Sequence, residues 1–81
     1  MGKKILIVDD AMFMRKMIRK ILEEDGYTDL EEAQDGEAAL ELFEPFDPDL
    51  VLLDITMPGK SGLEVLEELL ARRPQTKVVM C

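Results

Sequence analysis

Several residue types are scarce or missing in this chain of 81 residues. It contains no histidine, no tryptophan and a single cysteine, Cys81. One cysteine cannot form an internal disulfide, and a chain without histidine lacks the commonest protein ligand of zinc. The sequence has no apolar run of about 18 residues, and its N-terminus lacks the apolar segment and cleavage site of a signal peptide. We therefore expect a cytoplasmic protein without a membrane span.

Basic residues are also few, and they are unevenly placed. The net charge is −8, from 18 acidic and 10 basic residues. Because contacts with phosphates dominate affinity for nucleic acids, we do not expect so acidic a chain to bind them. Between Ile21 and Ala71 the only base is Lys60. The bases near the N-terminus are interpreted either as a solvated helix face or as a local docking surface; they are Lys3, Lys4, Arg15, Lys16, Arg19 and Lys20.

The apolar pattern predicts strands that alternate with helices in one domain, residues 1–81. Short β-branched or leucine-rich runs are typical of buried strands, and apolar residues three and four positions apart are typical of amphipathic helices. The stripe of the first helix comprises Met14, Met17, Ile18, Ile21 and Leu22. The strands are expected at Lys4–Val8, Thr28–Ala33, Leu50–Leu53 and Lys77–Met80.

Capping residues and prolines place the other two helices. Asp35 is expected to cap a short second helix that runs to about Phe43, followed by a loop containing Pro45 and Pro48. Ser61 stands three residues before a glutamate, which is the spacing of a capping box. A third helix is therefore expected to begin after Ser61.

Three carboxylates follow the two most apolar strands. Asp9 and Asp10 come directly after Lys4–Val8, and Asp54 directly after Leu50–Leu53. Strands that alternate with helices pair in parallel, and the functional crevice of such a three-layer α/β sheet lies at the carboxyl ends of its strands. Mg²⁺ prefers oxygen ligands, and a divalent cation would relieve the repulsion among three carboxylates. The pattern indicates a site for magnesium-dependent phosphoryl chemistry on an aspartate.

Two motifs in this order resemble those of a known family. Ile7-Val8-Asp9-Asp10 ends the first strand, and Asp54-Ile55-Thr56-Met57-Pro58 with Gly62 follows the third. Together, on an alternating α/β pattern, they resemble the receiver domain of two-component response regulators. The segments Asp9-Asp10-Ala11 and Phe13-Met14-Arg15 are most similar to the stand-alone chemotaxis receivers. The resemblance covers the chain from Lys4 to Cys81.

The resemblance implies a fold, a reaction and partners. The fold would be flavodoxin-like, with strand order 2-1-3-4. Asp54 would be the phosphoacceptor, and Mg²⁺ would be held by Asp9, Asp10, Asp54 and the backbone carbonyl of Thr56. The phosphoryl group would come from a histidine kinase, a histidine-phosphotransfer protein or a small acyl phosphate, and the helix carrying Arg15 would resemble the surface that meets such partners. The module would not be an enzyme, because it would at most promote its own phosphorylation and dephosphorylation.

The family pattern also extends beyond this sequence. A receiver has five strand–helix units, whereas these residues correspond to a truncated (βα)3β unit that ends in the fourth strand. The family's hydroxyl residue after that strand, one position beyond Cys81, and its lysine after the fifth strand would be absent. We therefore expect Mg²⁺ binding to survive better than phosphorylation. The strand Lys77–Cys81 would form an apolar edge, so we expect a homodimer made by edge pairing or domain swapping.

Other interpretations fit the same residues. Asp9 and Asp10 are of the type that caps a helix N-terminus. The chain is also compatible with a structural receiver fragment that dimerises and does no phosphoryl chemistry. Asp54-Ile55-Thr56 has a superficial similarity to the Asp-x-Asp-x-Thr motif of haloacid-dehalogenase-like phosphohydrolases, but it lacks the second aspartate. The methionines of the first helix are interpreted as flexible core filler; they are Met12, Met14 and Met17.

Overall fold

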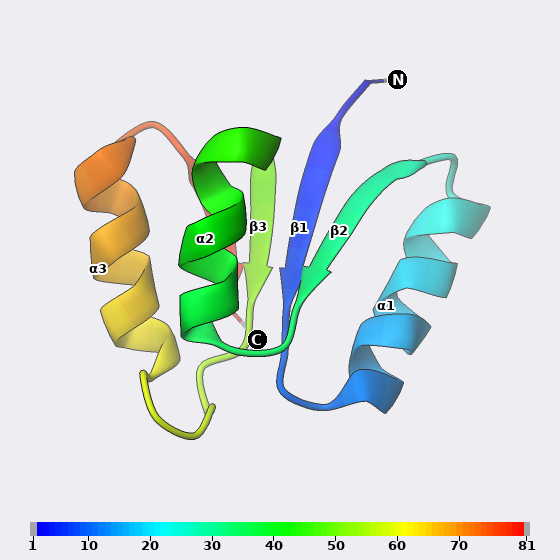
Figure 1. The fold of residues 1–81 in the computed structure, drawn as a ribbon. Helices are drawn as coiled ribbons and strands as arrows, with labels where there is room; N and C mark the ends of the chain where they lie inside the picture. The colour runs from blue at the N-terminus through cyan, green and yellow to red at the C-terminus, as the bar shows by residue number, and fades with distance from the viewer. Residues whose placement is uncertain (1, 81) are drawn as a thin grey trace.

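Four parallel strands and three helices make up residues 2–80, the part of the chain that the computed structural model describes. Within it, no helix combines the length and apolar character needed to span a bilayer. The strands lie in the order β2-β1-β3-β4, as the family resemblance implies (Figure 1). The elements in chain order are β1 (Lys4–Val8), α1 (Met12–Glu24), β2 (Asp29–Ala33), α2 (Gly36–Phe46), β3 (Leu50–Leu53), α3 (Gly62–Arg72) and β4 (Lys77–Met80).

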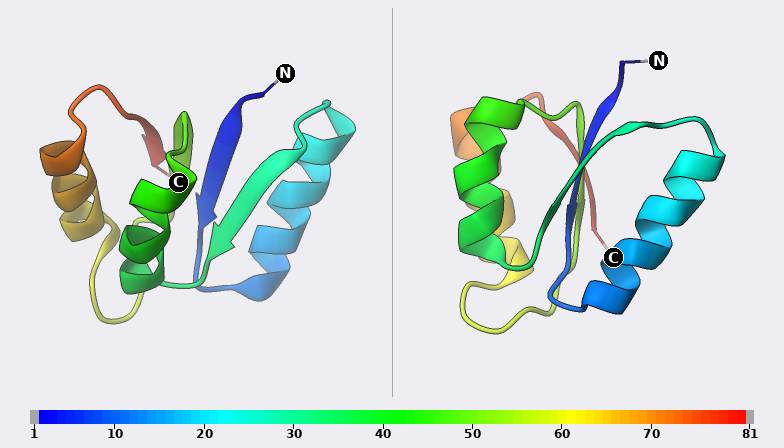
Figure 2. Two further views of the ribbon diagram at one scale, coloured as in Figure 1. Left: turned by 45° about the horizontal axis from the view of Figure 1, so that its top comes forward. Right: turned by 45° about the vertical axis from the view of Figure 1, so that its right-hand side comes forward.

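The sheet is the middle of three layers. Figure 2 shows α2 and α3 on one face and α1 on the other. Successive side chains of a strand point to opposite faces, so Leu6 and Val8 of β1 pack on the α2–α3 side, whereas Ile5 and Ile7 pack on the α1 side. All four side chains are at least 98% buried. This two-sided burial explains why β1 is apolar without interruption from Ile5 to Val8 rather than alternating.

Helix α1 lies less deeply on the sheet than its apolar pattern predicts. None of its residues is buried, and only Ile18 and Leu22 pack against the core on that side. The interpretation of its methionines as core filler is therefore wrong. The apolar side chains of α1 that are exposed are Met12 (63%), Phe13 (76%), Met14 (39%), Met17 (41%) and Ile21 (59%).

Helix α2 continues three residues beyond its predicted end. It includes Pro45, which was expected in a loop, and ends at Phe46. A proline in the last turn removes only one N–H donor, and the helix closes beyond it because the Asp47 N–H donates to the Phe43 carbonyl at 2.9 Å. Arg73 secures this end of the helix, since it pairs with Asp47 and stacks 4.9 Å from the ring centroid of Phe43.

Candidate functional site

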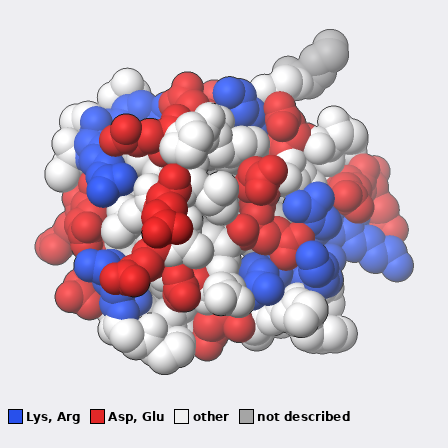
Figure 3. Space-filling view, in the orientation of Figure 1, with Lys and Arg blue, Asp and Glu red and all other residues white. Residues whose placement is uncertain are grey.

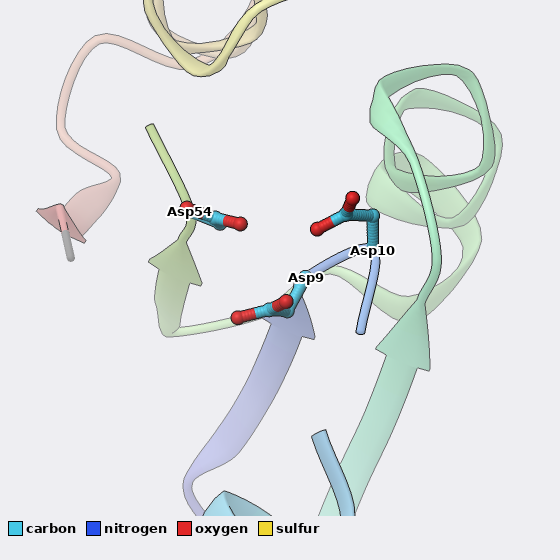
Figure 4. Close-up of side chains that lie close together, drawn as sticks. All are labelled: Asp9, Asp10 and Asp54. Carbon is cyan, nitrogen blue, oxygen red and sulfur yellow. The ribbon is translucent and has the colours of Figure 1, made fainter. Parts of the chain in front are cut away.

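The three carboxylates expected at the sheet edge do meet there. Asp9, Asp10 and Asp54 each offer one oxygen atom, and these atoms lie within 4.8 Å of one another. Figure 4 shows the carboxylates of Asp10 and Asp54 turned toward each other, with Asp9 at the end of β1 beside them. Asp10 is exposed and the other two are partly buried. The cluster is therefore held by the sheet on one side and is open to solvent on the other.

The hydrogen-bond ladder of the sheet extends into this cluster. The Asp9 N–H donates to the carbonyl of Ala33 on β2 at 3.1 Å, and the Asp54 N–H donates to the carbonyl of Val8 on β1 at 2.9 Å. Each aspartate is thus the first residue beyond its strand, with its backbone still fixed by the neighbouring strand. Parallel pairing in register therefore sets the spacing between Asp9 and Asp54.

Local hydrogen bonds orient two of the carboxylates. The Ala11 N–H donates to Oδ1 of Asp9 at 2.9 Å, and the Thr56 N–H donates to Oδ1 of Asp54 at 3.1 Å. The N-cap residue of α1 is Ala11, and no side chain caps that helix. The interpretation of Asp9 and Asp10 as an N-cap and its neighbour is therefore wrong. The Thr56 hydroxyl also lies 3.4 Å from the same Oδ1 atom.

A tightly built turn leads from Asp54 into α3. Both hydrogen bonds of the predicted capping box are present, between the Ser61 side chain and the Glu64 N–H and between the Glu64 side chain and the Ser61 N–H. The bond from the Ser61 backbone lowers the pKa of Glu64. A side chain at Gly62 would not fit, because its Cβ would lie 2.7 Å from the Cα of Ile55 and closer still to the Asp54 carbonyl. The start of α3 therefore rests directly on the backbone that carries Asp54.

The loop beside the cluster carries Lys60, the lone base of the middle of the chain. Its ammonium donates to Glu68 on α3 at 2.7 Å. That hydrogen bond raises the pKa of Lys60, and the charges of Glu64 and Glu37 add to the effect. Lys60 therefore fastens the loop to α3 rather than reaching into the carboxylate cluster.

A second charged network adjoins the cluster, and the sequence did not suggest it. Glu32 on β2 accepts hydrogen bonds from Arg15, Lys16 and Arg19 of α1. Its burial would raise its pKa, but the hydrogen bonds from Arg19, Lys16 and Arg15 together hold the pKa below its ordinary value. Hydrogen bonding to Glu32 in turn raises the pKa of Arg19. Nη1 of Arg15 also donates to the carbonyl of Asp9 at 2.7 Å.

The basic residues of α1 thus do not form a fully solvated face. The side chain of Arg15 is only 11% exposed, whereas that of Lys16 is 59% exposed. Figure 3 shows one group of basic side chains over α1 with acidic ones beside it, and acidic side chains interspersed with further basic ones over α2 and α3. A spacing of four residues places Arg15 and Arg19 on one side of the helix, and this was the one available signal that a single anion could hold both.

Comparisons with known proteins agree with this arrangement. The family model of the response regulator receiver domain matches residues 5–81. Protein CcdB of Bacillus subtilis is 51% identical over 78 residues, which are 96% of this chain and 65% of that protein. Chemotaxis protein CheY of Listeria monocytogenes is 47% identical over 78 residues, which are 96% of this chain and 66% of that protein. The chain thus spans slightly less than two thirds of these relatives.

A solved structure supports the same relationship. The response regulator protein TrrA of Thermotoga maritima, solved in complex with Mg²⁺ and BeF, is 42% identical, with a TM-score of 0.91. The match covers 96% of this chain and 67% of that one. The flavodoxin-like strand order, the carboxylates at the strand ends and the match over residues 5–81 all lead to one assignment. The chain belongs to the response regulator receiver domain family.

Proposed function

We propose that residues 1–81 act as one phosphoacceptor domain of a two-component phosphorelay, with Asp54 as the acceptor and Mg²⁺ as the cofactor. The observation that carries this proposal is the meeting of Asp9, Asp10 and Asp54 within 4.8 Å at the carboxyl ends of β1 and β3. Membership of the receiver family supports the reaction class. In this function the domain is not an enzyme for other substrates, because the phosphoryl group ends on its own side chain.

The donor set fits Mg²⁺. Carboxylate oxygens are the ligands this hard cation prefers, and it usually keeps several waters, for which the exposed side of the cluster leaves room. Asp9, Asp10 and Asp54 would hold the ion through their side chains and Thr56 through its backbone carbonyl. When bound, Mg²⁺ supplies positive charge that offsets the carboxylates and draws phosphoryl oxygens toward Asp54.

The residues of the chain suit Asp54 to nucleophilic attack. One of its oxygens accepts the Thr56 N–H, which fixes the carboxylate and leaves the other oxygen for the incoming phosphorus. With a phosphohistidine donor, an O–P bond forms at Asp54 as the N–P bond breaks, and the imidazole keeps the electron pair. The product is an aspartyl phosphate whose charge adds to that of Asp9 and Asp10.

The partner that delivers the phosphoryl group is proposed to be a histidine kinase or a histidine-phosphotransfer protein. The surface of α1 beside the site supports this, because Phe13 is 76% exposed and the Lys16 side chain is 59% exposed. Exposed apolar and basic side chains together suit a protein partner with an apolar surface and an acidic rim. Chemotaxis proteins among the relatives are consistent with this kind of partner.

Phosphorylation can be tested by native mass spectrometry after incubation with Mg²⁺ and acetyl phosphate. We expect a phosphoryl adduct on the wild-type chain and none on Asp54→Asn. Asp29→Asn is the matched control, because Asp29 is an exposed aspartate at the start of β2, away from the cluster, and should leave the adduct unchanged. A wild-type chain that binds Mg²⁺ but never gains the adduct would contradict phosphoacceptor function.

The second candidate function is self-association without phosphoryl chemistry, for which we propose a homodimer. It is supported by β4, which within residues 2–80 pairs only with β3 and leaves Val79 49% exposed. Open apolar edges are templates for strand pairing or for exchange of elements between copies. Light scattering should give a dimer mass that falls to the monomer mass in Val79→Lys. Gln75→Lys, an exposed change before β4, should remain dimeric, and a wild-type monomer at high concentration would contradict the proposal.

A further inference from the structure

Ion pairs between one carboxylate of β2 and three basic side chains of α1 join this helix to the sheet. Glu32 on β2 accepts from Nε of Arg15 at 3.2 Å and from Nζ of Lys16 at 3.1 Å, and it also accepts from Arg19. The side chain of Glu32 is only 11% exposed. Only two apolar side chains of α1 pack against the core. The ion pairs with Glu32 are therefore a major contact that holds α1 against β2.

Arg15 connects this network to the carboxylate cluster. While its Nε atom is held by Glu32, its Nη1 atom donates to the backbone carbonyl of Asp9 at 2.7 Å. The N–H of Asp9 is bound at the same time to Ala33, the residue after Glu32 on β2. Arg15 thus reaches the backbone of one residue of the acidic cluster, and its observed hydrogen bonds go to that backbone oxygen and to Glu32.

The hydrogen-bond partners of Arg15 affect whether the carboxylates remain free to bind a cation. A guanidinium is permanently charged and binds carboxylates through two parallel hydrogen bonds. Arg15 already contacts the backbone of Asp9. If Glu32 did not hold it, the carboxylates of Asp9 and of the adjoining Asp10 would offer it new partners, and these are the groups proposed to bind Mg²⁺. An arginine on those carboxylates would occupy their oxygens and oppose a divalent cation by charge repulsion.

We propose that Glu32 is a positioning residue for the acidic site, because it holds Arg15 on the Asp9 carbonyl and away from the carboxylates. The cluster of Asp9, Asp10 and Asp54 then stays open to a divalent cation. This inference rests on the proposed function, since it takes Mg²⁺ as the ion that the cluster binds.

The test is the affinity for Mg²⁺, measured by isothermal titration calorimetry on the whole chain. Glu32→Gln should weaken binding about tenfold, the lower end of the range found when a group that supports metal ligands is changed. The double variant Arg15→Met/Glu32→Gln should recover most of the lost affinity, because the competing guanidinium is gone. Circular dichroism identifies the variants that are folded.

Glu23→Gln is the matched control. It removes the same unit of charge from a glutamate that pairs with Arg19 at 3.5 Å but is 51% exposed. We expect its affinity for Mg²⁺ to stay within about twofold of the wild-type value, because at 51% exposure the removed charge is well solvated and screened.

The possible results distinguish the role of Glu32 from the proposed function. Wild-type affinity in Glu32→Gln, or an equal loss in the double variant, would overturn the role of Glu32 and leave the proposed function intact. A wild-type chain that binds no Mg²⁺ would overturn the proposed function itself. If Glu32→Gln does not fold, Arg15→Met alone is informative, since it should bind Mg²⁺ at least as tightly as the wild type, and weaker binding would overturn the inference.

Discussion

Gly62 shows how a single small residue shapes the turn that carries Asp54. Its N–H donates to the Ile55 carbonyl at 3.0 Å, and there is no room beside it for a Cβ atom. The atoms that block a side chain there belong to the backbone of Asp54 and Ile55, so a rotamer change cannot relieve the clash. The start of α3 and the end of β3 can be this close only because residue 62 is glycine.

Gly62→Ala should therefore destabilise the fold and displace the turn. We expect a loss of about 1–3 kcal/mol in the free energy of unfolding, as for other overpacked sites. Urea denaturation measures it. Glu67→Ala, an exposed change on the same helix, should stay within about 0.5 kcal/mol of wild type, and an equal effect of the two substitutions would contradict the steric explanation.

Glu32 gives a second prediction for a single residue, concerning pH. Its pKa is lowered from the ordinary value of 4.5, so its contribution to stability is complete above about pH 4.5 and is lost as the pH falls through the lower pKa of the folded state. At pH 7, Glu32→Gln should reduce the free energy of unfolding by about 1.5–3 kcal/mol, the range for hydrogen bonds to charged groups.

The difference between Glu32→Gln and wild type should shrink as the solution is acidified below pH 4.5. Urea denaturation at pH 7 and at pH 3 measures it. Glu23→Gln serves again as the control, because its half-exposed ion pair should contribute little at either pH. A difference that grows on acidification would mean that the pKa of Glu32 is raised, not lowered.

Among the elements, those with a strong local signal were predictable. Ser61 and Glu64 form the predicted capping box, Asp35 caps α2 by accepting the Ala38 N–H, and β1, β3 and β4 have the predicted bounds. The carboxylates of the site followed from the same reasoning, because strand ends in a parallel sheet lie along one edge.

Helix α1 was predicted as an element but its packing was not. Periodicity shows which side chains share a face, but not how deeply that face is buried. Here Arg15 and Arg19 bond to Glu32 on β2, while Met14 and Met17 remain 39% and 41% exposed. Glu32 lies 17 positions from Arg15 and 13 from Arg19, so local pattern shows at most that the two arginines share a side of the helix, not which anion holds them.

The capping box of α3 makes a prediction for that element. Ser61→Ala removes the acceptor of the Glu64 N–H and should lower the free energy of unfolding by about 1 kcal/mol. Thermal or urea denaturation measures it. Ser61→Asp keeps a capping oxygen and should retain most of the stability, so equal losses in the two variants would contradict a capping role.

At the scale of the whole molecule, the high negative charge makes stability sensitive to the cations in solution. The chain carries a net charge of −8, and three of its carboxylates meet at one point. A divalent cation bound there stabilises the folded state, because the unfolded chain has no such cluster.

Saturating Mg²⁺ should therefore raise the midpoint of thermal unfolding. At a free concentration one hundred times the dissociation constant, the gain is about 2.7 kcal/mol. Asp10→Asn should lose most of the gain, while KCl at matched ionic strength should not reproduce it in the wild type. If KCl and Mg²⁺ stabilise equally, general screening explains the effect and no specific site is needed.

The position of β1 also has a consequence for how the chain folds. This strand is synthesised first, yet both of its neighbours, β2 and β3, come later in the sequence. At a synthesis rate of about 5–20 residues per second, its apolar side chains remain without their β3 partners for several seconds after β1 is synthesised. Lys3 and Lys4 stand immediately before and at the start of this segment, where charges act as gatekeepers against aggregation of the nascent chain.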